Sequence, residues 1–326
     1  MKFGIIGAGG IARTMAGTVR QMEGVRRTAV AARSADRARR FAEEFGFERA
    51  YGDYEALLAD SEVELVYIAL PHSHHCEWTK RALEAGKHVL CEKAFAINEA
   101  QAREMIELSE RKGLLLAEAI WTRYMPARRM LDELVSEGVI GEITGLSANL
   151  GYEIDGHERI LRPELAGGAL LDLTVYPLNF ASMVFGDDIA SINGVCVLTD
   201  TGVDAQDSVA IRYKDGKTAS LFTTIYALTD RRGMIYGRGG FIEVENINNP
   251  RCIRVWSNDR DPGPRLLREL AVPPQLTGYE YEVEACARAI AAGAVECPEM
   301  PHAQTLEIMR QMDALRAQFG VVYPGE

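Results

Sequence analysis

The sequence is poor in cysteine, in positive charge and in long apolar runs. Its six cysteines stand singly in a chain of 326 residues, with no C-x-x-C pair. This spacing does not fit a disulfide scaffold and predicts free thiols in a reducing cytoplasm. Lys and Arg number 36 and Asp and Glu 47, a net charge of −11, which argues against nucleic acid as the main partner. No apolar run reaches the roughly 18 residues of a membrane helix, so we expect no membrane partner.

The composition is that of an ordinary folded protein. Charged residues make up 25% and hydrophobic residues 47% of the chain, which excludes large-scale disorder. At a rough prior of about 150 residues per domain, the length predicts two domains.

Apolar strands alternate with amphipathic helices over the first 120 residues. Strands are expected at 3–6, 28–32, 65–70, 88–91 and 114–117, with helices between them. This alternation predicts a doubly wound parallel sheet, an α/β fold, in a domain formed by residues 1–120.

The pattern changes in residues 121–326, which we assign to a second, α+β domain. Residues 208–213 alternate with period two, and 218–226 read as the returning strand of a hairpin. Further strands are expected at 143–152, 189–198, 233–236, 240–245 and 253–256, with helices at 168–184, 279–292 and 302–319. An open antiparallel sheet with helices on one face follows. Partly apolar strands such as 218–226 suggest that its other face meets a second subunit, which predicts a homodimer.

A glycine-rich turn follows the first strand and opens the first helix. Its G-x-G-x-x-A pattern lets the backbone approach a pyrophosphate at a helix N-terminus. The residues of this turn are Gly7, Gly9, Gly10, Ile11 and Ala12.

The end of the second strand carries no carboxylate. NAD-preferring sites place Asp or Glu there to bind the ribose hydroxyls, about 20 residues beyond the glycines. This chain instead offers Arg33, Ser34 and Arg37, two forked cations and a hydroxyl that suit a 2′-phosphate. We therefore predict NADP(H) in preference to NAD(H). Solvated arginines on a basic helix are the alternative.

Two further segments end strands on the predicted ligand side of the sheet. The first contains Leu70, Pro71 and His75, and the second Glu92 and Lys93. Three histidines and a cysteine crowd the first segment, but they are nearly consecutive and no second ligand cluster accompanies them, so no metal site is predicted.

The segment from Gly167 to Pro177 supplies candidate catalytic groups. In a helix, Asp172 and Tyr176 share a face at spacing i, i+4. Tyrosine has an ordinary pKa near 10, and an ammonium such as that of Lys93 lowers the pKa of a neighbouring tyrosine. These residue types suit an enzyme that exchanges a hydroxyl proton while a hydride moves.

Together these motifs resemble the glucose-fructose oxidoreductase, inositol dehydrogenase and MocA (Gfo/Idh/MocA) family of NAD(P)-dependent oxidoreductases. The resemblance covers essentially the whole chain. It is strongest to the branch of dimeric dihydrodiol dehydrogenases and NADP-dependent D-xylose dehydrogenases, through segments such as 118–124 and 168–172.

The resemblance implies a Rossmann domain and a role for each matching residue. Lys93 matches a lysine that contacts the cofactor and the reacting oxygen, Tyr176 a catalytic tyrosine, and Asp172 an aspartate that orients the substrate. Pro71 and His75 match a loop beside the nicotinamide, while Trp121 and Arg123 would line the substrate cleft. Ala94 departs from the usual proline after the lysine, and Leu70 and His72 replace a threonine and an asparagine.

The expected function is a hydride transfer between NADP(H) and a CH–OH or C=O group of a sugar, polyol or cyclic diol. In one assignment Tyr176 exchanges the hydroxyl proton, and Lys93 polarises the tyrosine or the substrate oxygen. In the other assignment Lys93 carries the proton and Tyr176 positions the substrate. A non-catalytic NADP(H) sensor and a reductase of an activated sugar, such as an anhydro-ketose, are the alternative functions.

Overall fold

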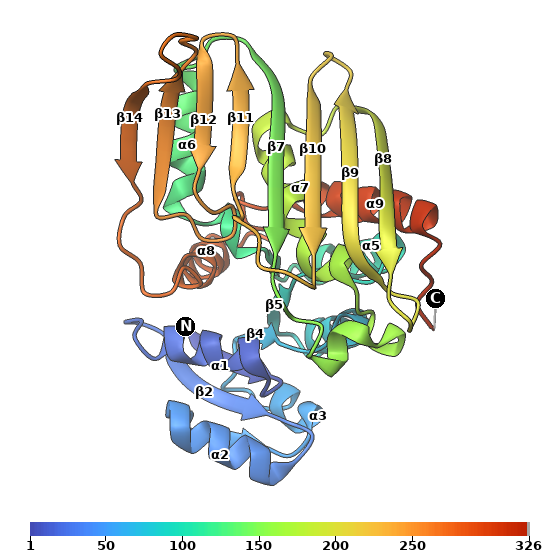
Figure 1. The fold of residues 1–326 in the computed structure, drawn as a ribbon. Helices are drawn as coiled ribbons and strands as arrows, with labels where there is room; N and C mark the ends of the chain where they lie inside the picture. The colour runs from blue at the N-terminus through green and yellow to red at the C-terminus, as the bar shows by residue number, and fades with distance from the viewer. Residues whose placement is uncertain (325–326) are drawn as a thin grey trace. The chain divides into compact units, whose positions relative to one another are not determined.

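The structure is a computed structural model that describes residues 1–324. Two compact units form the chain: unit 1 contains Met1–Tyr124 and Gln275–Leu306, and unit 2 contains Met125–Pro274 and the residues from Glu307 onward. Each unit has its own sheet (Figure 1).

Unit 1 contains a six-stranded parallel sheet in the order β3-β2-β1-β4-β5-β6. Its strands are β1 (Lys2–Ile6), β2 (Arg26–Ala31), β3 (Arg49–Tyr51), β4 (Leu65–Ile68), β5 (His88–Glu92) and β6 (Leu116–Ala119). The strand order reverses between β1 and β4, and ligands bind at such a point, beyond the carboxyl ends of the strands. The predicted doubly wound parallel sheet is confirmed.

Most helices of unit 1 connect its parallel strands, as predicted, and one further helix lies in residues 275–306. They are α1 (Gly10–Val19), α2 (Ala35–Phe45), α3 (Tyr54–Leu58), α4 (His75–Glu84), α5 (Glu99–Lys112) and α8 (Glu280–Ala291). Helix α5 begins where the Asn98 side chain accepts a hydrogen bond from the Gln101 N–H at 2.9 Å, and it ends at Gly113 in the left-handed region. Such local signals explain why helix positions could be read from the sequence.

Unit 1 also contains residues 275–306, which differs from the predicted assignment of the whole of 121–326 to the second domain. This segment covers the free edge of β6. The Leu116 N–H donates to the Val295 carbonyl at 2.9 Å, and the Leu116 carbonyl lies 2.8 Å from His302 Nε2. Edge strands carry unpaired backbone groups, so a distant segment that pairs with them becomes part of the same unit.

Unit 2 is built on an eight-stranded sheet in the order β14-β13-β12-β11-β7-β10-β9-β8. The strands are β7 (Ile143–Gly151), β8 (Ile189–Leu198), β9 (Asp204–Tyr213), β10 (Thr218–Thr224), β11 (Gly233–Gly237), β12 (Gly240–Val244), β13 (Cys252–Ser257) and β14 (Leu266–Ala271). The predicted antiparallel sheet is correct for every pair except β7 and β10, which run parallel. Alternation identifies strands but does not reveal which distant strand inserts between two hairpins.

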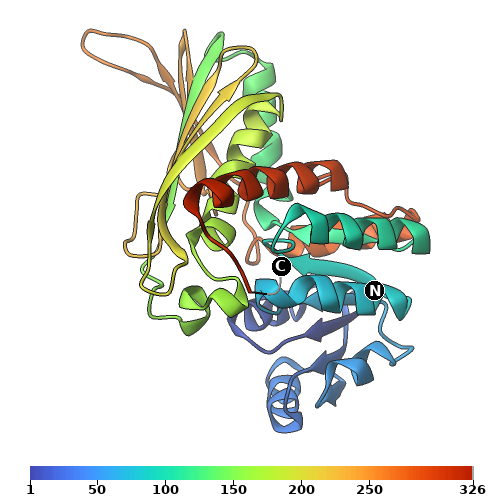
Figure 2. The ribbon, with the colours of Figure 1, turned by 90° about the vertical axis from the view of Figure 1, so that its right-hand side faces the viewer.

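Helices cover one face of this sheet (Figure 2): α6 (Pro126–Ser136), α7 (Val175–Phe185) and the part of α9 (His302–Phe319) that belongs to unit 2. A Cβ placed on Gly233 would lie 2.5 Å from the Phe180 ring of α7, and one on Gly194 would lie 2.8 Å from Leu315 of α9. The helical stretch Pro163–Phe185 is long and apolar enough to cross a membrane, but 83% of its apolar window is buried. It is a core helix of unit 2.

Candidate functional site

The glycine turn after β1 leaves backbone open where a phosphate could bind. Gly7 has φ +108°, and a Cβ there would lie 2.3 Å from the Ala69 carbonyl oxygen, so only glycine fits. A Cβ on Gly9 or Gly10 would meet no atom within 4 Å. Gly9 precedes α1 in an extended conformation and makes no side-chain cap, so the first N–H groups of this helix are available to an anion.

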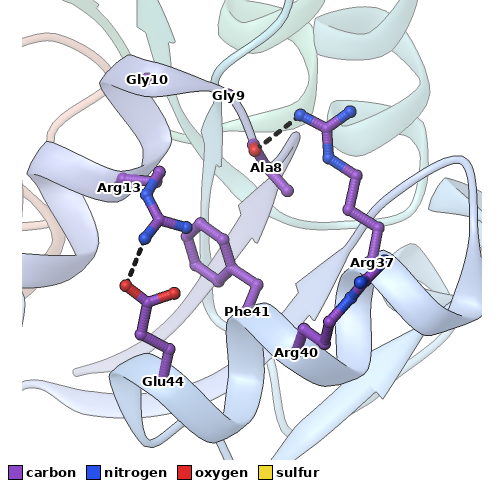
Figure 3. Close-up of a pocket in the computed structure, with 8 residues that line it drawn as sticks. All are labelled: Ala8, Gly9, Gly10, Arg13, Arg37, Arg40, Phe41 and Glu44. Carbon is purple, nitrogen blue, oxygen red and sulfur yellow. Dashed lines mark hydrogen bonds and ion pairs between the residues drawn. The ribbon is translucent and has the colours of Figure 1, made fainter.

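A pocket of about 470 Å³ lies between this turn and α2 (Figure 3). The Arg37 side chain crosses it and donates from Nη2 to the Ala8 carbonyl oxygen at 2.9 Å. The pocket is lined by Ala8, Gly9, Gly10, Arg13, Arg37, Arg40, Phe41 and Glu44. The structure thus brings the predicted Gly9, Gly10 and Arg37 together.

Arg33 and Ser34 precede α2 and are exposed. Ser34 is the N-cap residue of α2, but its hydroxyl makes no capping hydrogen bond. Arg33 and Arg37 both oppose the rise in the pKa of Tyr54 that burial causes, so both cations lie near that phenol. This end of β2 holds positive charge and no carboxylate, as the sequence predicted.

Two further residues of this pocket, Arg13 and Arg40, were not predicted as site residues. Arg13 is ion-paired with Glu44, and its guanidinium lies 5.1 Å from the centre of the Phe45 ring. Both arginines follow predicted site residues at helical spacing, Arg13 three residues after Gly10 and Arg40 three residues after Arg37. That i, i+3 relationship was the available signal.

The loops after β4 and β5 are joined by His75. Its side chain is buried, and its ring nitrogens lie 2.8 Å from the carbonyl oxygens of Leu70 and Ala94. Burial lowers the pKa of this imidazole to about 4, so the ring is neutral and donates one hydrogen bond. These contacts let His75 position the two loops, and its contact with the cofactor stays a prediction. Pro71 begins the short helix His72–His74 between these loops.

Glu92 is also buried, and its carboxylate accepts hydrogen bonds from residues of unit 1. One of its carboxylate oxygens accepts a hydrogen bond from the Tyr67 hydroxyl, and the other accepts the Lys93 backbone N–H at 3.2 Å. Both contacts stabilise the backbone conformation at Lys93. The Lys93–Ala94 peptide bond is cis.

Two further buried carboxyl groups near this strand end were not predicted. Burial raises the pKa of Glu118 to about 7, although the Thr305 hydroxyl donates to its carboxylate at 2.9 Å. Burial and the charge of Glu92 raise the pKa of Glu282 well above its ordinary value. No group of His, Cys, Asp and Glu residues within residues 1–324 could hold a metal ion.

Trp121 and Arg123, the predicted substrate residues of unit 1, belong to the short helix Trp121–Arg123 after β6. Both side chains are buried. The Trp121 ring stacks on Tyr279 with centroids 4.3 Å apart, and Arg123 donates to Gln304. The segment 275–306 therefore fixes the conformation of both residues.

Asp172 and Tyr176 lie in unit 2, on two different kinds of helix. Asp172 belongs to a π-helical turn, Leu170–Thr174, and Tyr176 to the first turn of α7. The single α-helix predicted over 168–184, with these residues on one face, is therefore wrong in its first turn. Such turns occur often at functional sites. Arg159 donates from Nη2 to Asp172 Oδ1 at 3.0 Å, and both Asp172 and Tyr176 are buried.

Two family models match successive parts of the chain. A family model described as "Oxidoreductase family, NAD-binding Rossmann fold" matches residues 1–119. A second model, described as the GFO/IDH/MocA C-terminal domain, matches residues 129–243.

Relatives match over the whole chain. A trans-1,2-dihydrobenzene-1,2-diol dehydrogenase from Danio rerio is 33% identical over 330 residues, covering 99% of this chain and 98% of the relative. An NADP⁺-dependent D-xylose 1-dehydrogenase from Hypocrea jecorina is 33% identical, with 99% and 93% covered. A solved 3-ketoreductase from Actinomadura kijaniata, in complex with NADP and TDP-benzene, has a TM-score of 0.88 at 28% identity, with 98% of each chain covered. The chain belongs to the GFO/IDH/MocA family and is an NAD(P)-dependent oxidoreductase.

Proposed function

We propose that this protein transfers a hydride between NADP(H) and a CH–OH or C=O carbon of a sugar, polyol or cyclic diol. The observation that carries the proposal is the pocket of unit 1, where open glycine backbone and arginine side chains meet. Relatives that span the chain include a dihydrodiol dehydrogenase and a xylose dehydrogenase, which supports a vicinal diol or a sugar as substrate.

The preference for NADP(H) rests on charge at the end of β2. Arg33, Arg37 and Arg40 are exposed guanidinium groups around a position where an NAD-specific site would carry a carboxylate. A 2′-phosphate needs forked donors and positive charge, and arginine supplies both. The pyrophosphate is assigned to the turn formed by Gly7, Gly9, Gly10, Ile11 and Ala12, and Leu70 and Pro71 flank the ligand through their loop.

Catalysis is assigned to Lys93, Asp172 and Tyr176. NADP(H), when bound, supplies or accepts the hydride. Tyr176 exchanges the hydroxyl proton of the substrate, and Lys93 polarises the oxygen through its positive charge. Asp172, held by Arg159 at 3.0 Å, orients the substrate by accepting a hydroxyl hydrogen bond. Trp121 and Arg123 of unit 1 are also assigned to substrate binding.

The open face of the unit 2 sheet is proposed to bind a second copy of the chain. Tyr236, Phe241 and Trp256 stand opposite one another on three neighbouring strands. Val195 is 71% and Phe222 38% exposed on other strands of this sheet. Exposed apolar side chains on a sheet face are typical of an interface, and two-fold pairing is the commonest way to cover one. The unpaired cysteines of residues 1–324 fit a cytoplasmic location.

An absorbance assay at 340 nm tests the proposed activity. Purified protein would be incubated with NADP⁺ or NADPH and a panel of aldoses, inositols, dihydrodiols and dicarbonyls. Turnover with at least one member of the panel is expected, faster with NADP(H) than with NAD(H). Tight NADPH binding without turnover of any substrate would contradict the proposal and favour a sensor.

A further inference from the structure

Two aspartates of β9 lie buried against the turn that carries Asp172. Asp204 is 0% exposed and Asp207 1%. Ionised carboxyl groups are rarely buried without partners because their desolvation is costly. Leu170 donates to Asp204 and Thr174 donates to Asp207, and both donors belong to the turn Leu170–Thr174.

A β-bulge puts both carboxyl groups on the same side of the sheet. Residues three apart on a regular strand point to opposite faces. In the pairing of β8 with β9, Val197 lies opposite Gln206 and Leu198 opposite Asp204, so Ala205 is an extra residue. This insertion reverses the alternation once and turns Asp204 and Asp207 toward the same helical turn.

Asp204 holds the beginning of the turn. Its Oδ2 accepts the Leu170 N–H, and the Ala169 N–H also bonds to its carboxylate. This approach needs the glycine before the turn: Gly168 has φ +107°, and a Cβ there would lie 2.4 Å from Asp204 Oδ1. Asp204 therefore explains why a glycine stands at position 168.

Asp207 holds the end of the same turn. Its Oδ2 accepts the Thr174 hydroxyl at 2.6 Å, and that hydroxyl lies 2.5 Å from the Thr223 hydroxyl of β10. Asp172 stands midway between Leu170 and Thr174, so the two aspartates bracket it.

A single proton completes the pair. The Oδ1 atoms of both aspartates are buried and have no hydrogen-bond partner among the described residues, and each carboxyl group shifts the pKa of the other. Burial raises the pKa of Asp204 to about 6, and burial together with the charge of Asp204 raises the pKa of Asp207 much further. The charge of one carboxyl group therefore favours the protonated form of the other, and a shared proton would satisfy both Oδ1 atoms.

We propose that Asp204 and Asp207 are positioning residues for the reaction: an acid and a carboxylate on β9 that hold Leu170–Thr174 in its π-helical form and thereby set Asp172 and Tyr176. This inference rests on the proposed function, since it gives Asp172 and Tyr176 their catalytic roles. Both side chains are buried, so we expect the pair to act through the turn and not through its own contact with the substrate.

Matched variants of the two aspartates test this inference. Asp207→Asn keeps a donor toward Asp204 and an oxygen for Thr174, so its kcat is expected within about threefold of wild type. Asp204→Asn removes the negative charge that two backbone N–H groups share, and its kcat should fall at least about tenfold. The dissociation constant for NADPH, measured by fluorescence, should stay within about twofold in both, because that site belongs to unit 1.

A double variant separates positioning from a general loss of structure. If Asp204 acts through Asp172, then Asp204→Asn adds little to the loss of kcat in Asp172→Asn, because the two losses are not independent. Losses that multiply, or equal kcat values for Asp204→Asn and Asp207→Asn, would overturn the inference. Should Asp204→Asn not fold, Thr174→Val is the second variant: it removes the hydroxyl that contacts Asp207 and Thr223 and should lower kcat without changing NADPH binding. An unchanged kcat in Thr174→Val would also overturn the inference.

The proposed function can fail separately from this inference. Asp172→Asn with wild-type kcat would contradict the catalytic assignment itself. A large loss in Asp172→Asn together with a wild-type rate in Asp204→Asn would leave the proposed function standing and refute the positioning role.

Discussion

Arg37 of α2 donates a hydrogen bond from Nη2 to the carbonyl oxygen of Ala8, at 2.9 Å, and so connects the end of β2 to the glycine turn after β1. One guanidinium thus spans the positions proposed for the 2′-phosphate and the pyrophosphate. Because a guanidinium carries five N–H donors, this backbone contact leaves other donors for a phosphate. The hydrogen bond from Arg37 to Ala8 therefore holds the proposed anion site in shape.

The cofactor preference should depend on Arg33. Arg33→Ala is expected to raise the KM for NADP⁺ by about tenfold or more, because a charge-assisted hydrogen bond to the 2′-phosphate is lost. The KM for NAD⁺ should change little. Arg39→Ala is the control, since Arg39 is exposed on the same helix and paired with Asp36. Equal increases for both cofactors would show that Arg33 does not read the 2′-phosphate.

Tyr176 and Lys93 should have separable effects on the rate. Tyr176→Phe is expected to lower kcat by about 10²-fold or more, the usual contribution of a positioned proton-transfer group. Lys93→Met should also slow the reaction. The pH–rate profiles of the two variants assign the proton: whichever variant abolishes the ionisation that governs kcat has lost the proton carrier.

A control for this experiment is Tyr226→Phe, at an exposed position beyond β10, which should keep the wild-type rate. Unchanged kcat in both Tyr176→Phe and Lys93→Met would eliminate the proposed catalytic group.

Gly168→Ala should destabilise the protein more than an alanine at another left-handed glycine. Gly216 has φ +92° and open space around it. Gly216→Ala should therefore lower the free energy of unfolding by only about 1–2 kcal/mol, the cost of a left-handed conformation for alanine. Gly168→Ala adds a clash with Asp204 Oδ1 and should therefore melt lower and lose activity. Circular dichroism melting and the 340 nm assay measure both effects. Similar melting temperatures for the two variants would argue against a close contact between Gly168 and Asp204.

Glu118 should make stability depend on pH. The folded protein keeps the Glu118 proton up to a pKa of about 7, while an unfolded glutamate loses it near 4.5. Between these values the folded state binds more protons, so its stability falls as pH rises. Glu118→Gln lacks this pH-dependent contribution. Between pH 5 and pH 8 the free energy of unfolding of wild type should therefore fall relative to that of Glu118→Gln, by up to about 3 kcal/mol.

Melting temperatures of wild type and Glu118→Gln, taken without cofactor at pH 5 and pH 8, check this prediction. Glu23→Gln, at an exposed position, serves as the control and should follow the wild type. A constant difference between wild type and Glu118→Gln at the two pH values would mean that Glu118 does not titrate in this range.

The open sheet face should determine the oligomeric state. Val195→Glu places a charge at a side chain that is 71% exposed on β8 and should convert a dimer to monomers at micromolar concentration, as measured by light scattering. Val322→Glu changes a valine that is equally exposed, at 73%, but lies outside the sheet, and should leave the dimer intact. A wild-type monomer would refute the proposal.

Much of unit 1 could be predicted because its signals are local. The turn after β1, the caps of its helices and the apolar runs of its buried strands all lie within short segments. In contrast, β14 went unpredicted because its side chains are almost all exposed and show no alternation. The three-residue β3 was too short for a pattern, and α6 was missed although Pro126 opens it.

The amino-acid sequence by itself determined the parallel sheet, the glycine turn and the positive charge at the end of β2, because these depend on periodicity, backbone freedom and residue type. Only the tertiary structure decided that residues 275–306 cover the edge of β6, that β7 runs parallel to β10, and that Asp204 and Asp207 reach the turn of Asp172. These relationships join segments tens to hundreds of residues apart. They depend on the pairing register of the strands and on a single inserted residue, Ala205, and neither produces a periodic pattern in the sequence.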